Sequence, residues 1–253
     1  MNLRDTAVIV TGGASGLGAA TGAALAAAGA RVTLLDLDRA RGEAHAAEIG
    51  GRFDAVDVTD DAAVGAALDA AQAAHGVARV LVNCAGIAPA SRVVNREGQP
   101  HALALFRKVV EINLIGTFCV AAAFAARLTK ADPVGEGRGV IVNTASVAAF
   151  DGQIGQAAYA ASKGGVAALT LPLARDLAQH GIRVMTIAPG LFLTPMLSGM
   201  PQAVQDSLGQ QVPFPSRLGK PDEYAQLVLS IIGNPILNGE TIRLDGALRM
   251  TPR

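Results

Sequence analysis

One stretch near the N-terminus limits the choice of fold more than any other: a short β-branched run, a glycine-rich turn and a helical segment follow one another directly. Residues 6–10 resemble a strand, residues 11–18 have the sequence TGGASGLG, and residues 19–28 have the pattern of a helix that Gly29 ends. This order is typical of parallel α/β proteins that bind dinucleotides. The spacing is G-x-x-x-G-x-G rather than the commoner G-x-G-x-x-G, and glycine loops are frequent, so the motif alone leaves the function open.

Each glycine of this turn has a separate task if the turn binds a dinucleotide. Gly12 permits the tight turn, Gly16 lets the backbone approach a pyrophosphate, and Gly18 lets the helix and the strand pack closely. The phosphates would then lie at the positive end of the helix.

The rest of the chain repeats the alternation of short apolar strands and helices. Strand patterns occur at residues 6–10, 31–35, 52–58, 79–82, 139–142, 183–187 and 241–244. They predict an α/β fold with one Rossmann-like, doubly wound parallel sheet of about seven strands and helices on both faces, in a single domain over residues 1–253. Residues 191–218 contain several prolines and no core-strand pattern, so we expect them to cover the mouth of a pocket. Pro172 should kink or break the helix that contains it.

Composition and charge exclude several classes of protein. Lys and Arg number 21 and Asp and Glu number 21, so there is no electrostatic reason to expect a nucleic acid or an anionic membrane as partner. No run of about 18 strongly apolar residues is evident. Cys84 and Cys119 are too few for a disulfide framework, and a strand begins almost at once, which leaves no room for a secretory signal. The four histidines share no metal-ligand spacing, so no metal is expected.

Asp36 follows the second strand, 18 residues after Gly18. An acidic residue about 20 residues beyond the glycine turn binds the adenosine ribose hydroxyls, and its charge would repel a 2′-phosphate, which favours NAD over NADP. An Asp after a strand is also a common helix cap. Arg39 and Arg41 argue the other way, because a nearby basic side chain could accommodate a phosphate.

Three candidate catalytic residues lie between Asn143 and Lys163. Ser146 follows the apolar strand at 139–142, and ligands bind at the carboxyl end of such strands. Tyr159 and Lys163 are four residues apart, so on a helix they share a face. A nearby ammonium would lower the phenol pKa so that Tyr159 can act as a base, while Ser146 holds a substrate oxygen. Y-x-x-x-K alone also occurs on many ordinary helices.

Two further polar or small-residue sites suit a pocket. The sequence Asn83-Cys84-Ala85-Gly86 closes the fourth strand, and its small residues would let the backbone lie against a flat ring, although a plain tight turn explains them equally well. Asn113 interrupts an apolar helical stretch, where a buried amide without partners costs about 1–3 kcal/mol. It is either a structural crosslink or part of a polar relay.

Taken together, these motifs resemble the short-chain dehydrogenase/reductase family along essentially the whole chain. The ordered features are T-G-x-x-x-G-x-G, the acidic strand end, Asp57-Val58, N-C-A-G, Asn113, Ser146, Tyr159-x-x-x-Lys163 and Pro189-Gly190. Within that family, residues 143–165 and the ending GETIRLDGALRM are similar to the type 2 3-hydroxyacyl-CoA dehydrogenases. In that group the usual N-N-A-G is also N-C-A-G.

The resemblance implies an NAD-dependent homotetramer that oxidises the 3-hydroxyl of short or branched acyl-CoA thioesters, with some activity on steroid alcohols. It implies that Tyr159 is the proton acceptor, that Lys163 binds the nicotinamide ribose, that Ser146 holds the substrate oxygen and that Asn113 supports a water relay. The expected cofactor contacts are Gly12, Ser15, Gly16, Leu17, Gly18, Asp36, Asp57, Val58, Cys84, Ala85, Gly86, Tyr159, Lys163, Pro189, Phe192 and Thr194. The expected substrate contacts are Ser146, Gln153, Gln156 and Tyr159.

Three other functions remain open at the level of sequence. The chain could oxidise a steroid or another secondary alcohol, or reduce a 3-oxoacyl group on a carrier protein, although the latter reaction generally draws on NADPH and Asp36 counts against it. It could also be a subunit that keeps the fold and works through partners. We expect a small-molecule substrate, no nucleic acid or membrane partner, and a cytoplasmic location.

Overall fold

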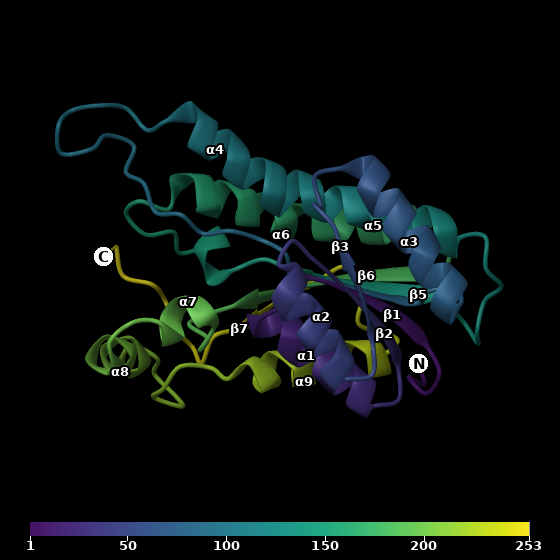
Figure 1. Ribbon diagram of the computed structural model, residues 1–253. Coiled ribbons are helices and arrows are strands. Elements are labelled where there is room, and N and C mark those ends of the chain that lie inside the picture. Colours follow the sequence, from purple (N-terminus) through teal and green to yellow (C-terminus); the bar gives the residue numbers. More distant parts are fainter. Residues whose placement is uncertain (253) are drawn as a thin grey trace.

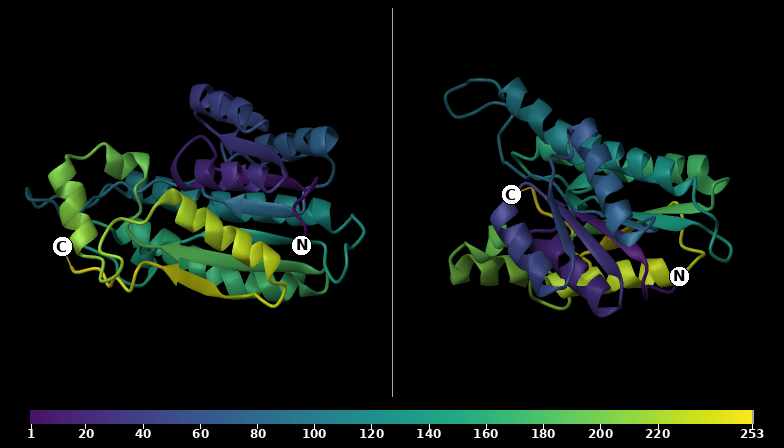
Figure 2. Two further views of the ribbon diagram at one scale, coloured as in Figure 1. Left: turned by 90° about the horizontal axis from the view of Figure 1, so that it is seen from below. Right: turned by 45° about the vertical axis from the view of Figure 1, so that its right-hand side comes forward.

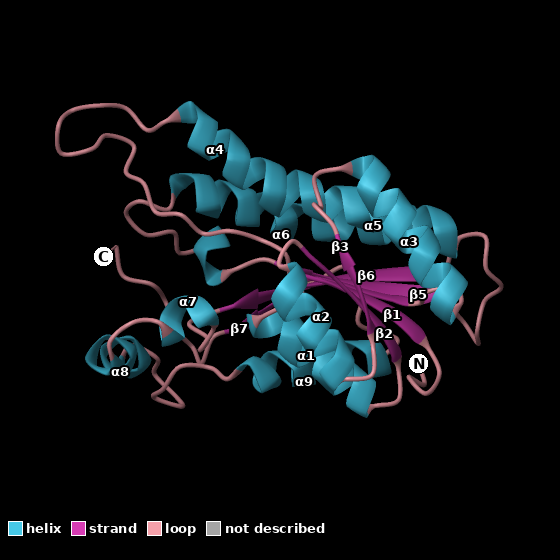
Figure 3. Cartoon of the chain, in the orientation of Figure 1, coloured by secondary structure: helices cyan, strands magenta, loops and turns pink. Residues whose placement is uncertain are grey.

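The computed structural model describes residues 1–252. Its centre is a parallel sheet of seven strands in the order β3-β2-β1-β4-β5-β6-β7 (Figures 1 and 3). The strands are β1 (Ala7–Thr11), β2 (Arg31–Asp36), β3 (Arg52–Ala55), β4 (Val80–Asn83), β5 (Gly139–Thr144), β6 (Ile182–Pro189) and β7 (Thr241–Leu244). The predicted doubly wound sheet is therefore confirmed. The strand order reverses between β1 and β4, and the carboxyl ends of strands at such a point are where α/β sheets bind ligands.

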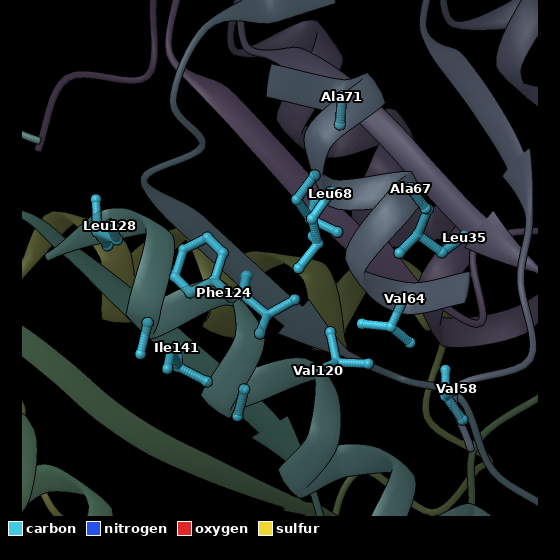
Figure 4. Packing of buried hydrophobic residues seen from close by; sticks show 14 of the residues in the cluster. Leu35, Val58, Val64, Ala67, Leu68, Ala71, Val120, Phe124, Leu128 and Ile141 are labelled. Atoms are coloured by element: carbon cyan, nitrogen blue, oxygen red, sulfur yellow. The ribbon is translucent and has the colours of Figure 1, made fainter. Parts of the chain in front are cut away.

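Helices cover both faces of the sheet, because the strands carry apolar side chains on both. Ile9 and Ile141 pack with α3 (Asp61–His75) and α5 (Thr117–Leu128), whereas the neighbouring valines of the same strands pack on the other face. Figure 4 shows the first cluster, in which Phe124 and Leu68 lie over the sheet. The second face is covered by α1 (Gly16–Ala27), α2 (Arg39–Glu48) and α9 (Pro221–Gly233) (Figure 1).

A continuous helical stretch from Leu103 to Leu128 combines α4 (Leu103–Val110), a π-helical turn (Glu111–Gly116) and α5. Contrary to the expectation from sequence, this stretch is long and apolar enough to cross a membrane by length and composition. In its most apolar window 44% of the residues are buried inside the structure. It packs against the sheet as a core helix of a soluble protein does (Figure 4).

The helix α6 (Ala157–Ala178) passes through Pro172 as one element, so the predicted break is absent. Pro172 removes the hydrogen bond to the carbonyl of Ala168, and both residues are exposed, so water can satisfy that carbonyl. The segment 191–218, in which we found no core-strand pattern, contains two short helices, α7 (Pro195–Ser198) and α8 (Gln202–Gln210). Figure 2 shows them at the end of the molecule near the C-terminus, far from the N-terminus.

Candidate active site

A cavity of about 430 Å³ lies at the carboxyl ends of the central strands. The loops that follow β1, β2, β3, β4, β5 and β6 all contribute to its wall. Of the expected cofactor residues, the structure places these in the lining: Gly12, Ser15, Gly16, Leu17, Gly18, Asp36, Asp57, Val58, Cys84, Ala85, Gly86, Tyr159, Lys163, Pro189 and Thr194. The doubly wound topology brings them together from the segments that end or follow six strands, β1 to β6.

The glycine turn packs so closely that side chains are excluded. Gly12 has φ +65°, and a Cβ there would lie 2.7 Å from the backbone nitrogen of Ala85. A Cβ on Gly18 would lie 2.2 Å from the carbonyl oxygen of Gly12. The side chain of Ser15, at the N-cap of α1, makes no capping hydrogen bond, so the first N–H groups of this helix are available to an anion. The turn therefore fits the diphosphate of a dinucleotide.

The Asp36 carboxylate is held in a fixed orientation by two backbone groups. Ala14 N donates to Oδ2 at 3.0 Å and Asp38 N donates to Oδ1 at 3.0 Å. The helix cap that could have explained an acid here is Asp38 instead, whose side chain accepts from Arg41 N. Asp36 is thus free to present its remaining lone pairs to ribose hydroxyls in the cavity.

The two arginines that could bind a 2′-phosphate are engaged elsewhere. Arg41 Nε pairs with Asp38 at 2.6 Å, and Arg39 Nη1 pairs with Glu43 at 3.0 Å. Neither arginine lines the cavity. Among the residues that the structure describes, the charged ones in the lining are therefore Asp36, Asp57 and Lys163, and no arginine is among them.

Lys163 is buried beneath the cavity floor, with 4% of its surface exposed. Its Nζ donates a 2.7 Å hydrogen bond to the carbonyl oxygen of Thr144, at the end of β5, and lies 6.0 Å from the centre of the Tyr159 ring. Burial lowers the pKa of Lys163 to about 8. The helical spacing of four residues and the strand end thus place an ammonium beside the phenol.

Burial raises the pKa of Tyr159, and a hydrogen bond with Ser146 partly offsets this. The sequence predicted a pKa lowered by the neighbouring ammonium, and that prediction is wrong. The physical reason is that burial disfavours the charged phenolate more than the hydrogen bond with Ser146 favours it.

Ser146 has its proton available for a partner in the pocket. Its Oγ accepts a 3.1 Å hydrogen bond from Ala148 N, which occupies a lone pair and leaves the O–H as donor. The side chain is buried at the end of β5, where the chain turns toward α6. A donor fixed in this way can hold a phenolate or a substrate oxygen.

Asn113 is fully buried and forms a crosslink. Its Nδ2 donates to the carbonyl of Ile87 at 2.9 Å and to Ser162 Oγ at 3.0 Å, while its Oδ1 accepts from Ile87 N at 2.8 Å. Ser162 Oγ in turn donates to the carbonyl of Tyr159 at 2.8 Å. These bonds join the cavity-lining loop after β4 to the catalytic turn of α6.

Five expected site residues lie outside the lining of this cavity, namely Asn113 and Ser146, which bond to residues around it, and Gln153, Gln156 and Phe192. Gln156 Oε1 accepts from Gln153 N at 3.0 Å, and Gln153 Nε2 donates to the Thr251 carbonyl at 3.0 Å, so both glutamines hold the loop and the C-terminal tail together. The Phe192 side chain lies in a neighbouring cavity of about 130 Å³, packed against Gly219.

The sequence reasoning missed several residues of the lining. They include Leu37, Ile87, Ala88, Ile112, Thr144, Ala145 and Pro195. Most are small or apolar residues without a motif of their own, and all but Ile112, in the π-helical turn, and Pro195, at the start of α7, lie at or shortly after a strand end. Position relative to the strands was the signal that could have identified those at the strand ends. Within residues 1–252, no group of three or more His, Cys, Asp or Glu side chains could hold a metal ion.

A glycine turn for a diphosphate, an acid for a ribose and a buried Tyr, Lys and Ser together define a nicotinamide-dependent oxidoreductase. Residues 6–205 match the family model described as short chain dehydrogenase, and the chain belongs to this family, whose members use NAD or NADP.

Full-length relatives carry a more specific name. The chain is 54% identical over 255 residues to the 3-hydroxyacyl-CoA dehydrogenase type-2 of Homo sapiens, covering 99% of this chain and 98% of the human one. It is 52% identical over 254 residues to the protein of the same name from Drosophila melanogaster, covering 99% and 100%. The crystal structure of 3-hydroxyacyl-CoA dehydrogenase type-2 from Mycobacterium avium is similar with a TM-score of 0.94 and 42% identity, over 98% of this chain and 97% of that one.

Proposed function

We propose that this chain oxidises the 3-hydroxyl group of short or branched 3-hydroxyacyl-CoA thioesters to the 3-oxo group, with NAD as the hydride acceptor. The observation that supports the reaction type is that Tyr159 and Lys163 line the same cavity as Asp36, while Ser146 hydrogen-bonds to Tyr159. The substrate class rests on the full-length similarity to type-2 3-hydroxyacyl-CoA dehydrogenases.

In this proposal each side chain handles the substrate oxygen or its proton. Ser146 Oγ–H donates a hydrogen bond to the oxygen on C3, and the Tyr159 oxygen accepts the hydroxyl proton as the hydride leaves C3. When bound, NAD supplies the hydride acceptor and a positively charged nicotinamide ring, which favours phenolate over phenol. Lys163, held by Thr144, keeps its charge next to the phenol.

NAD is proposed rather than NADP because of the charge at the adenosine end of the cavity. The Asp36 carboxylate is fixed by two backbone N–H groups, and a 2′-phosphate would face it at close range. The arginines that could compensate are paired with Asp38 and Glu43.

The test is an assay of purified protein for NADH absorbance with NAD and 3-hydroxybutyryl-CoA or its 2-methyl derivative. A steroid alcohol with NAD, and a 3-oxoacyl carrier protein with NADPH, serve as competing substrates. We expect the highest kcat/KM with an acyl-CoA and NAD. Absence of turnover with every thioester would contradict the substrate class. A cellular role that is undiminished by Tyr159→Phe would instead favour a partner-binding subunit.

We also propose that the protein is a homotetramer. Large apolar side chains are exposed on two neighbouring helices, namely Ile115 and Phe118 around the start of α5 and Leu171 on α6. A second copy of the chain that covers these helices would bury them. Light scattering coupled to gel filtration should give four times the chain mass, and Phe118→Lys should lower it, whereas a monomeric wild-type protein would contradict the proposal.

A further inference from the structure

The second tyrosine of the chain, Tyr224, reaches the catalytic centre from the opposite face of the sheet. It belongs to α9, is fully buried, and does not line the cavity. Its hydroxyl lies 2.7 Å from Thr144 Oγ1. Thr144 is the residue whose carbonyl oxygen accepts the hydrogen bond from Lys163 Nζ. A single residue at the end of β5 therefore connects Tyr224 on one face to Lys163 on the other.

The direction of each hydrogen bond follows from the number of protons. Thr144 Oγ1 lies 2.6 Å from the carbonyl oxygen of Asn83, which can only accept, so the threonine proton is used there. Tyr224 must then donate to Thr144. The Tyr224 oxygen can accept from the Cys84 thiol, whose Sγ lies 3.8 Å away. The Thr144 side chain is thus held by two short hydrogen bonds: it donates to the Asn83 carbonyl and accepts from Tyr224.

Thr144 could not fix Lys163 as firmly without these bonds. It is the last residue of β5, and the peptide that follows it is tied to β6 by one backbone hydrogen bond, from Ala145 N to the carbonyl of Ile187 at 2.8 Å, before the chain turns at Ser146. Its peptide orientation is therefore set by its side-chain partners as well as by the sheet. We propose that Tyr224 is a positioning residue of the reaction, which holds the Thr144 carbonyl in place as the anchor of the Lys163 ammonium. This inference rests on the proposed function in one respect, which is that the proposed function assigns Lys163 a catalytic role.

The titratable groups that face Lys163 come from three elements. Tyr159 lies on α6, Cys84 follows β4, and Tyr224 lies on α9 behind Thr144. Burial raises the pKa of Tyr159, of Cys84 and of Tyr224, so all three stay neutral at neutral pH. Lys163, with a pKa of about 8, is the first group of this cluster to change charge as the pH rises. The pKa of Lys163 therefore depends on how well the Thr144 carbonyl is placed to accept its hydrogen bond.

The test is the pKa of Lys163 in the wild type and in Tyr224→Phe, measured by NMR of isotopically labelled lysine side chains. Few signals are expected, because the lysines of the chain are Lys108, Lys130, Lys163 and Lys220. Lys163→Met assigns the signal. Loosening one hydrogen bond to a charged group should lower the midpoint by about half a pH unit to one unit. In the proposed reaction the protonated lysine is the active form. The alkaline limb of the plot of kcat/KM against pH should therefore shift to lower pH by the same amount, with little change in KM.

A matched control removes a similar buried hydroxyl that makes no bond to Thr144, Tyr224 or Lys163. Thr186 lies on β6, opposite Asn143, and its Oγ1 bonds Thr170 Oγ1 of α6 at 2.6 Å, so Thr186→Val should leave the Lys163 midpoint unchanged. An unchanged midpoint in folded Tyr224→Phe would overturn the inference and reduce Tyr224 to a packing residue. Should that variant not fold, Thr144→Val decides in its place, since it removes the same contact: a lowered midpoint supports the inference and an unchanged one overturns it. The NMR measurement needs no substrate, so it is independent of whether acyl-CoA is turned over.

Discussion

Replacing Asp36 by Asn should exchange the cofactor preference of the protein. The carboxylate accepts one backbone N–H on each oxygen, from Ala14 and from Asp38. Asn has a single acceptor oxygen, so its amide NH₂ would face one of these N–H donors, and the ribose hydroxyls would lose a charged acceptor. A hydrogen bond to a charged group contributes about 1.5–3 kcal/mol, so kcat/KM for NAD should fall about tenfold to a hundredfold.

The same change removes a charge repulsion from NADP. The 2′-phosphate carries about −1.5 to −2 charges, and relief from a carboxylate a few ångströms away amounts to about 2 kcal/mol at an effective dielectric between protein and water. The kcat/KM for NADP should therefore rise about tenfold or more. Combined with the loss for NAD, the ratio of the two should change by about a hundredfold to a thousandfold.

The assay is steady-state kinetics with each dinucleotide at a saturating concentration of the acyl-CoA. Asp61→Asn is the matched control, because Asp61 loses the same charge in the first turn of α3 and does not line the cavity. If Asp36→Asn changes the ratio no more than Asp61→Asn does, the carboxylate does not select the cofactor, and the reasoning from its geometry fails.

Three further changes have outcomes that follow from single contacts. Asp38→Asn keeps the N-cap of α2 but releases Arg41, so the kcat/KM for NADP should rise while that for NAD stays nearly constant; no gain would show that Arg41 cannot reach the cavity. Gly18→Ala places a Cβ 2.2 Å from a backbone oxygen and should lower the free energy of unfolding by more than about 2 kcal/mol in denaturant titrations, whereas Gly233→Ala meets nothing within 4 Å and should be nearly neutral. The Asp151 pKa is lowered by its ion pair with an arginine of β7, so Asp151→Asn should lower the melting temperature near neutral pH. The difference should shrink as the pH falls below about 4, where the carboxyl of the unfolded chain is protonated, and vanish only below the lowered pKa, where the folded wild-type carboxyl is protonated as well. A difference that persists in acid would mean that packing, not charge, is lost.

The fold could be predicted because its signals are local. Each predicted strand is a short β-branched or apolar run, and the observed strands differ from the predicted ones by a few residues at the ends. The strand β3 ends at Ala55 rather than at residue 58, since Val58 instead packs against Gly116. The π-helical turn around Asn113 could not be predicted from periodicity, because it depends on the loop at Ile87 to which the asparagine is bonded.

Site residues that belong to sequence motifs could be predicted. Residues whose side chains are placed by tertiary contacts could not. The glycine turn and Asp36 have fixed spacings, so their meeting in one cavity follows from the topology. Gln153 and Gln156 have no such constraint, and their side chains bond the loop and the C-terminal tail. Tyr224 lies in an ordinary amphipathic helix 80 residues beyond Thr144 in sequence, and only the packing of α9 under the sheet brings the two together.

The most direct measurement for the whole account is the single-turnover rate of NADH formation by Tyr159→Phe with a 3-hydroxyacyl-CoA, together with the affinity for NADH. Phe keeps the ring but cannot accept the alcohol proton, so the rate should fall by about a hundredfold to ten-thousandfold, the contribution typical of a general base. NADH affinity should stay close to the wild-type value, because the glycine turn and Asp36 are untouched. A variant that forms NADH at the wild-type rate would contradict the assignment of the base.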